Sequence, residues 1–301
     1  MLRDFLVSMP PQSDMMPGVR NQTTLKRPIS LSGIGLHSGQ QVEMTFRPAE
    51  AGSGIRFCRL DVDEKPEIPA QVRYVSQTTR STTITWRKWS VHTVEHVLAT
   101  LAGYGIDNLV IELGASEPPI ADGSAAVYCK MVEEAGIQTL DQMVEPFTIP
   151  HTIEFEVDQT LMVALPHPGL KITCTSTDAQ GRFTQFESID VTPESWVTEL
   201  SRARTFCFFE ELEQLFKHGL IQGGSLQNAV VIREDAILTT EPMRYSNEFV
   251  RHKMLDILGD LSLVGRPLIG HFIAFRPGHS ANCLMAQKIA SLIGAPNPVG
   301  S

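Results

Sequence analysis

The stretch Ser90–Gly103 (SVHTVEHVLATLAG), followed closely by Asn108–Leu113 (NLVIEL), has the pattern of a helix leading into a strand. Ser90 is a typical helix N-cap, and Gly103 would end the helix. Four apolar residues between them recur at helical spacing: Val91, Val94, Leu98 and Leu101. A Pro/Gly loop and a helix over residues 124–135 complete a helix–strand–helix unit.

The second half of the chain repeats this order of elements. Ser246 and Gly265 bracket a helix whose apolar face comprises Val250, Met254, Ile257 and Leu261. An apolar strand over residues 268–275 follows, and a last helix ends at Gly294. Because sheets and helices bury their apolar faces against each other, we expect an α+β fold of two related two-layer sandwiches, each a sheet with packed helices.

The chain divides into three parts on this interpretation. Residues 1–20, rich in methionine, proline and glycine, show no periodicity and predict a disordered N-terminal extension. Residues 21–145 are expected to form the first domain and residues 146–301 the second. Residues 204–231 are interpreted as an insertion in the second domain, because an amphipathic helical pattern there is followed by two glycines.

The composition restricts the class of protein. The 301 residues include 25 lysines and arginines and 34 aspartates and glutamates, which gives a formal net charge of −9. Such an acidic chain is not expected to bind nucleic acid, and its apolar runs are too short for stable insertion in a membrane. The five cysteines are scattered and form no CxxC pair, which favours a reducing compartment and therefore the cytoplasm.

Two short stretches place metal-binding side chains one helical turn apart. His252 and Asp256 lie at i and i+4 on one helix face, and neutral imidazole and carboxylate oxygen are ordinary zinc ligands. An isolated pair of this kind is more often a His–Asp contact on a helix surface.

The other stretch, His92-Thr-Val-Glu-His96, matches the HxxEH pattern of inverted zinc metalloproteases. In that interpretation both histidines bind zinc and Glu95 activates water. Alternatively only Glu95 and His96 are functional, and His252 and Asp256 supply the other ligands, with one position open for water. The five-residue pattern alone leaves both interpretations open.

Further motifs occur in order around these two stretches. They are Gly35-Leu-His-Ser-Gly39, Asp122-Gly-Ser-Ala125, Arg204-Thr-Phe206, Arg251–Asp256 with Gly259-Asp260, and Gly278-His279. Together with Thr93-Val-Glu-His96, this set closely resembles the UDP-3-O-acyl-N-acetylglucosamine deacetylase family, the zinc enzymes of lipid A biosynthesis in Gram-negative bacteria. The resemblance covers residues 22–290.

The resemblance implies a zinc metalloamidase that removes acetate from UDP-3-O-acyl-N-acetylglucosamine, the committed step of that pathway. It implies that His96, His252 and Asp256 hold one Zn²⁺ per chain at the interface of the two domains, although the same N/O ligand set also suits Fe²⁺.

The family pattern also implies the catalytic roles. Glu95 is expected to be the general base, and His279 the second acid–base residue that protonates the leaving nitrogen. Asp260 is expected to orient His279 and raise its pKa. Thr205 is expected to donate to the developing oxyanion, and without the family pattern it would be the N-cap of a helix over residues 206–216.

The remaining residues carried over from the family are expected to contact the substrate. They are Lys253 and Arg276 toward the nucleotide phosphates, Phe206, Phe209, Leu212, Gly224 and Ser225 toward the acyl chain, and His37. His37 either faces the active site or satisfies a turn. No role is assigned to the loop over residues 77–81, and the expected oligomeric state is monomeric.

Two rival interpretations remain. An inverted-motif metalloprotease predicts that the metal depends on His92 and is indifferent to Asp256, whereas the deacetylase predicts the reverse. A non-catalytic binder of acylated nucleotide sugars would be free to lose catalytic residues, and the set found here is complete.

Overall fold

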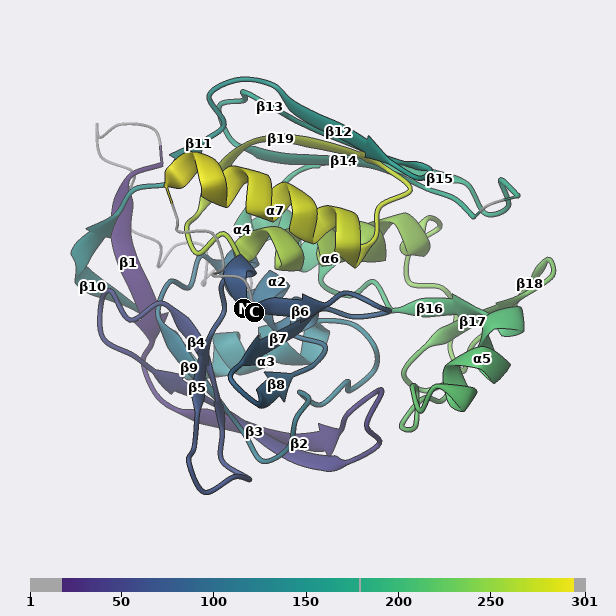
Figure 1. Ribbon diagram of the computed structural model, residues 1–301, viewed down its shortest axis with the longest axis horizontal. Helices are drawn as coiled ribbons and strands as arrows, with labels where there is room; N and C mark the ends of the chain where they lie inside the picture. Colours follow the sequence, from purple (N-terminus) through teal and green to yellow (C-terminus); the bar gives the residue numbers. More distant parts are fainter. Residues whose placement is uncertain (1–17, 179, 295–301) are drawn as a thin grey trace.

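The computed structural model describes residues 18–178 and 180–294 (Figure 1). Most of the predicted N-terminal extension, residues 1–17, therefore lies outside the described residues. Its last residue, Arg20, already begins a strand, β1 (Arg20–Leu25), which pairs with β10 (Ile137–Val144).

The first half is built on a five-stranded sheet of order β2–β3–β9–β4–β5. The strand bounds are β2 (Ile29–Ile34), β3 (Gln41–Pro48), β4 (Ile55–Arg59), β5 (Glu67–Pro69) and β9 (Leu109–Leu113). Only the β4–β9 pair is parallel. The helices α2 (Glu95–Tyr104) and α3 (Ala126–Ala135) belong to the same half.

The second half repeats this topology strand for strand. Its sheet has the order β12–β13–β19–β14–β15, again with one parallel pair, β14–β19, among these five strands. The bounds are β12 (Ile153–Val157), β13 (Thr160–Leu165), β14 (Leu170–Ser176), β15 (Gln185–Asp190) and β19 (Leu268–Phe275), with α6 (Glu248–Ser262) and α7 (His279–Ile293). The short strand β11 (Phe147–Thr148) also pairs with β19. The predicted α+β fold of two related sandwiches is confirmed.

Helices α2, α3, α6 and α7 lie between the two sheets (Figure 1). Alternation along β3 places Val42, Met44 and Phe46 on the buried face, as expected for a strand with one face against helices. The two halves meet where α2 packs on α6. A Cβ added at Gly259 would overlap the backbone oxygen of Glu95, so only glycine permits this close approach of the two helices.

Each half also carries a small three-stranded sheet. Along the chain it lies between β5 and α2 in the first half and between β15 and α6 in the second. In the first half these strands are β6 (Val75–Gln77), β7 (Thr83–Trp86) and β8 (Trp89–Val91). In the second half they are β16 (Phe206–Phe208), β17 (Val230–Arg233) and β18 (Ala236–Leu238), with α5 (Leu212–Lys217) between the first two. We call residues 206–238 the insertion lobe, which projects to the right in Figure 1.

Three predicted helix starts are wrong. Val91 ends strand β8, and α2 begins only at Glu95, because Thr93 has a left-handed φ of 54° that a helix cannot accommodate. The helix expected over residues 206–216 begins instead as strand β16, because these residues pair with β17; a 3₁₀ turn over Phe209–Glu211 leads into α5. Thr205 is therefore not a helix N-cap. In α6 the N-cap is Asn247 rather than Ser246.

Two predicted helix ends are also wrong: α2 includes Gly103 and ends at Tyr104, with Gly105 as its left-handed C-cap, and α6 ends at Ser262 rather than just before Gly265. The bounds at the end of the chain agree better with the prediction. Strand β19 covers Leu268–Phe275 as expected, and α7 ends at Ile293 with Gly294 in the left-handed conformation. Among the described residues, none of the helices combines the length and apolar character needed to cross a bilayer. The domain boundary at residues 145/146 stays a prediction; β10 ends at Val144 and β11 begins at Phe147.

Candidate active site

Two histidines and one aspartate converge where α2 meets α6. His252 and Asp256 share one face of α6, with 3.4 Å between His252 Nε2 and Asp256 Oδ1. His96 comes from the first turn of α2, and its Nε2 lies 3.9 Å from the same Asp256 oxygen. All three side chains are buried. Among the described residues they are the one group of His, Cys, Asp or Glu side chains close enough together to hold a metal ion.

The protonation of this cluster suits metal binding. Burial and the neighbouring His252 lower the pKa of His96 to about 3, so its imidazole is neutral. Burial also lowers the pKa of His252, whose Nδ1–H donates to the carbonyl oxygen of Ala203 at 3.0 Å. This bond fixes the tautomer and leaves the Nε2 lone pair directed at the cluster. Burial opposes ionisation of Asp256, but the nearby His252 and Lys253 outweigh it and lower its pKa.

The ligand atoms fit a small divalent ion. Four-coordinate zinc with bonds of about 2.0–2.2 Å places neighbouring ligand atoms roughly 3.3–3.6 Å apart. The 3.4 Å between His252 Nε2 and Asp256 Oδ1 falls in this range, and the 3.9 Å between His96 Nε2 and the same oxygen lies slightly above it. Asp256 Oδ1 is buried and finds no hydrogen-bond donor among the described residues. A buried carboxylate oxygen without a donor is costly, and a cation would satisfy it.

Glu95 opens helix α2 beside His96 and is almost completely buried. Its Oε2 accepts a hydrogen bond from the backbone N–H of Thr82 at 3.0 Å. Burial raises the pKa of this carboxyl to about 8, even though the positive charge of His279 acts in the opposite direction. A carboxyl group whose pKa is raised toward neutrality has the range required of a general base.

His279 and Asp260 form the second acid–base pair. Asp260 is fully buried, and its Oδ2 lies 2.9 Å from His279 Nδ1. Thr82 Oγ1 and Asn282 Nδ2 donate to the same carboxylate. Burial lowers the pKa of His279, but the negative charges of Asp260 and Glu95 outweigh burial and raise it to about 9. The imidazole is therefore protonated at neutral pH.

A cavity of about 220 Å³ connects these groups. Its lining includes the predicted residues Thr205, Phe206 and Lys253, with the ligands, Glu95 and His279. It also includes residues that sequence reasoning missed: Leu36, Thr78, Arg80 and Thr93. Thr78 and Arg80 belong to the loop left without a role, and no local motif marks them, because they reach the site only through the fold of the β6–β7 connection.

A second cavity of about 250 Å³ adjoins the first and shares Arg80, Phe206 and Lys253 with it. Positive side chains on its wall include the predicted Arg276 and the unpredicted Arg182, beside the rings of Phe183 and Phe208. Lys253 Nζ lies 3.1 Å from Asp256 Oδ2 and 5.4 Å from the centre of the Phe206 ring. The second cavity therefore offers cations and aromatic faces next to the metal cluster.

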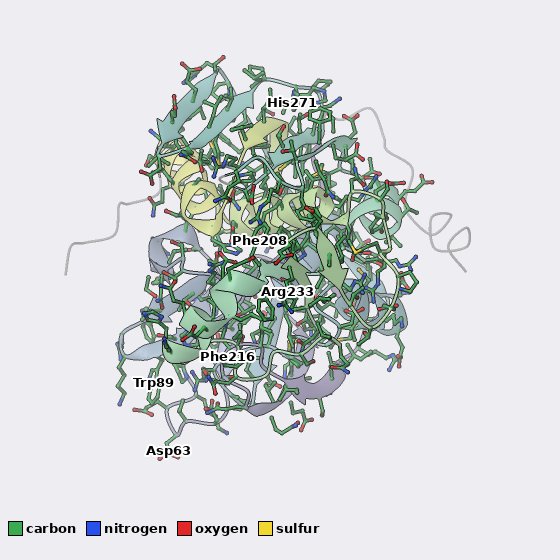
Figure 2. All side chains as sticks on the ribbon, turned by 90° about the vertical axis from the view of Figure 1, so that its right-hand side faces the viewer. Asp63, Trp89, Phe208, Phe216, Arg233 and His271 are labelled. Atoms are coloured by element: carbon green, nitrogen blue, oxygen red, sulfur yellow. The ribbon has the colours of Figure 1, made fainter. Side chains whose placement is uncertain are left out.

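The structure does not bring the remaining predicted substrate residues to these cavities. Phe209 is 42% exposed and carries the Arg233 guanidinium over its ring, and Leu212 lies in α5. Gly224 packs against Ile221 of its own turn, and the Ser225 backbone N–H donates to Asn228 Oδ1. In Figure 2 the insertion lobe faces the viewer, with Phe208, Arg233 and Phe216 labelled. His37 contacts the insertion lobe rather than lining either cavity.

His92, the first histidine of the HxxEH pattern, points away from the metal-binding group. Its Nδ1 lies 3.0 Å from Thr83 Oγ1, and it is not a member of the metal-binding group. The spacing of HxxEH places His92 one helical turn from His96 only if the helix extends back to residue 92. Because α2 begins at Glu95, the two imidazoles do not share a helix face.

This α+β fold, with two neutral imidazoles and a carboxylate beside an acid–base pair, defines a metal-dependent hydrolase. Residues 22–291 match the family described as UDP-3-O-acyl N-acetylglycosamine deacetylase, and the chain belongs to that family. The chain is also similar to the UDP-3-O-acyl-N-acetylglucosamine deacetylase of Myxococcus xanthus (strain DK1622). The two are 42% identical over 280 residues, which cover 92% of this chain and 88% of the relative.

Proposed function

We propose that this protein hydrolyses the N-acetyl group of UDP-3-O-acyl-N-acetylglucosamine to give UDP-3-O-acyl-glucosamine and acetate, for lipid A biosynthesis in the cytoplasm. The observation that carries the proposal is the convergence of His96, His252 and Asp256 beside Glu95 and the protonated His279, in a chain of the deacetylase family. Removal of an acetyl group from nitrogen needs both a base and an acid, and the site holds one of each.

His96, His252 and Asp256 would hold the metal, which we propose to be zinc, although the same ligands accept ferrous iron. Such a cation, when bound, acts as a Lewis acid toward the substrate carbonyl, lowers the pKa of water and favours the ionised form of a neighbouring carboxyl.

The protein's own groups would move the protons. Glu95 takes a proton from the attacking water as that water adds to the acetyl carbon. The Thr205 hydroxyl, half-buried on the cavity wall, donates to the oxygen on which negative charge develops. His279 then gives its proton to the departing nitrogen, because an amine anion is a very poor leaving group. Asp260 keeps His279 protonated and fixes its orientation.

The second cavity would bind the UDP group. Its cations, Lys253, Arg276 and Arg182, suit a diphosphate, and its aromatic side chains suit the flat face of a uracil ring. The acyl chain would extend toward the insertion lobe. We expect a monomer, which sedimentation at several protein concentrations tests.

The first test measures metal content by mass spectrometry and acetate release from the acylated UDP-sugar on the same samples. Wild type and His92→Ala are expected to hold near one metal ion per chain and to release acetate. Asp256→Ala is expected to lose both. Loss of metal in His92→Ala alone, with no acetate from any sample, would refute the proposal and favour the metalloprotease.

A further inference from the structure

The insertion lobe contacts the first half of the molecule at several points, including an ion pair between Arg80 and Glu211, and one of these contacts is a turn. Residues Ile221–Gly224 of the lobe lie against the loop Gly35–Gly39 and make three hydrogen bonds to it. The backbone N–H of Gln222 donates to the oxygen of His37 at 3.2 Å, and that of Gly223 donates to the oxygen of Leu36 at 3.0 Å. The third bond runs from the Ile221 N–H to Nδ1 of His37, at 3.3 Å.

The two segments touch backbone to backbone. A Cβ added at Gly223 would overlap the carbonyl oxygen of Gly35, and one added at Gly39, where φ is +64°, would lie 3.0 Å from Gln222 Cβ. Ile221 itself has a left-handed φ of 52°, an unfavourable conformation for a β-branched residue. The turn therefore needs support from its surroundings, and the three hydrogen bonds to Gly35–Gly39 provide it.

The receiving loop is itself fixed from behind by Glu117. This fully buried carboxylate accepts hydrogen bonds from the backbone N–H groups of His37 and Ser38 and from Thr93 Oγ1. Thr93 comes two residues before Glu95, and Leu36 lines the cavity that contains the metal cluster. The loop thus joins the docked turn to the wall of the active site and to the start of α2.

The His37 ring makes a specific bond in this contact. Because Ile221 N–H is the donor, Nδ1 must be the unprotonated nitrogen of the ring. Burial lowers the pKa of His37, although the charge of Glu117 opposes it, so the neutral form that accepts this bond is favoured. Nε2 is buried and has no hydrogen-bond partner within residues 18–178 and 180–294.

We propose that His37 is a positioning residue for the acyl chain: through Nδ1 it fixes the Ile221–Gly224 turn, and with it this part of the insertion lobe, beside the active site. It acts through Ile221 and not on the substrate itself. This inference rests on the proposed function, because it assigns the docked lobe to the long acyl group of that substrate. A misplaced lobe would then weaken the use of long chains more than that of short ones.

The test uses two amide variants that differ in where they place an acceptor. In His37→Asn the side-chain oxygen lies near the position of Nδ1, whereas in His37→Gln it lies one bond further out, near Nε2. For each variant, kcat and KM are measured with a long-chain and a 3-O-acetyl UDP-sugar, and amide hydrogen exchange is measured over residues 212–228.

Loss of one hydrogen bond costs about 1 kcal/mol, which corresponds to a five- to tenfold change in an equilibrium constant. We therefore expect His37→Gln to lower the ratio of long-chain to short-chain kcat/KM about fivefold to tenfold, mainly through KM, and to speed exchange at residues 220–224. His37→Asn is expected to retain most of the wild-type ratio and exchange protection.

Equal ratios in the two variants and wild type, or a loss that is the same for both substrates, would overturn the positioning role. Unchanged exchange at residues 220–224 in His37→Gln would overturn the docking contact. If wild type releases no acetate from either substrate, the proposed function fails, while the exchange comparison still decides whether His37 holds the turn.

Discussion

The buried charge of Asp260 controls the protonation of His279, and Asp260→Asn removes that charge while keeping the size of the side chain. Asp260 is the first of the groups that raise the pKa of His279 to about 9, and it also accepts the hydrogen bond from Nδ1. Glu95 and Asp256 contribute in the same direction, while burial opposes them. Without Asp260, burial is expected to return this pKa to the ordinary value of about 6.5 or lower.

The magnitude follows from this difference of about 2.5 pKa units, or roughly 3.4 kcal/mol between the two protonation states. At pH 7.5 the protonated fraction of His279 would fall from about 97% to about 9%. If the protonated imidazole supplies the proton to the leaving nitrogen, kcat at pH 7.5 falls at least about tenfold in Asp260→Asn. The alkaline limb of the pH–rate profile should move from near pH 9 to near pH 6.5.

The assay is acetate release between pH 5.5 and 10, with metal content checked for each sample. Asn282→Ser is the matched control, because Asn282 donates to the same Asp260 oxygen but carries no charge. Its alkaline limb should stay above pH 8. An alkaline limb that does not move in Asp260→Asn would show that His279 does not act in its protonated form, and the reasoning would fail.

Four further predictions concern stability. Glu248 is buried and bridges both Nε and the backbone N–H of Arg204, so Glu248→Ala should lower the free energy of unfolding by about 3–5 kcal/mol in urea titrations. Arg204 outweighs burial and keeps the pKa of Glu248 below its usual value. The pair's contribution to the free energy of unfolding should therefore be complete above about pH 4.5 and be lost as the pH falls further. A pH-independent difference in stability between wild type and Glu248→Gln would contradict this. Gly259→Ala should lower the free energy of unfolding by about 1–3 kcal/mol and reduce activity, because the added methyl overlaps the Glu95 backbone oxygen and separates α2 from α6. An unchanged melting temperature and unchanged kinetics would disprove the close approach of the two helices. Removal of the metal with a chelator should lower the melting temperature of wild type, and an identical shift in Asp256→Ala would be inconsistent with binding at this cluster.

Local patterns in the sequence determined much of this protein. The spacing of apolar residues predicts α6, β19 and α7 nearly at their observed ends, because periodicity reflects which face of an element is buried. The i, i+4 spacing likewise places His252 and Asp256 on one helix face, whatever surrounds the helix. The repeated helix–strand–helix order indicates two related halves for the same reason.

The tertiary structure alone decided how these pieces meet. The start of α2 depends on the left-handed Thr93 and on the pairing of β8 with β7, which no helical periodicity reports. His96 joins His252 because Gly259 lets two helices from different halves approach, and Ile221 reaches His37 across the molecule. Apolar spacing records which side of an element is buried, but not which distant side chain it is buried against. Such pairings arise only when the two sandwiches pack together.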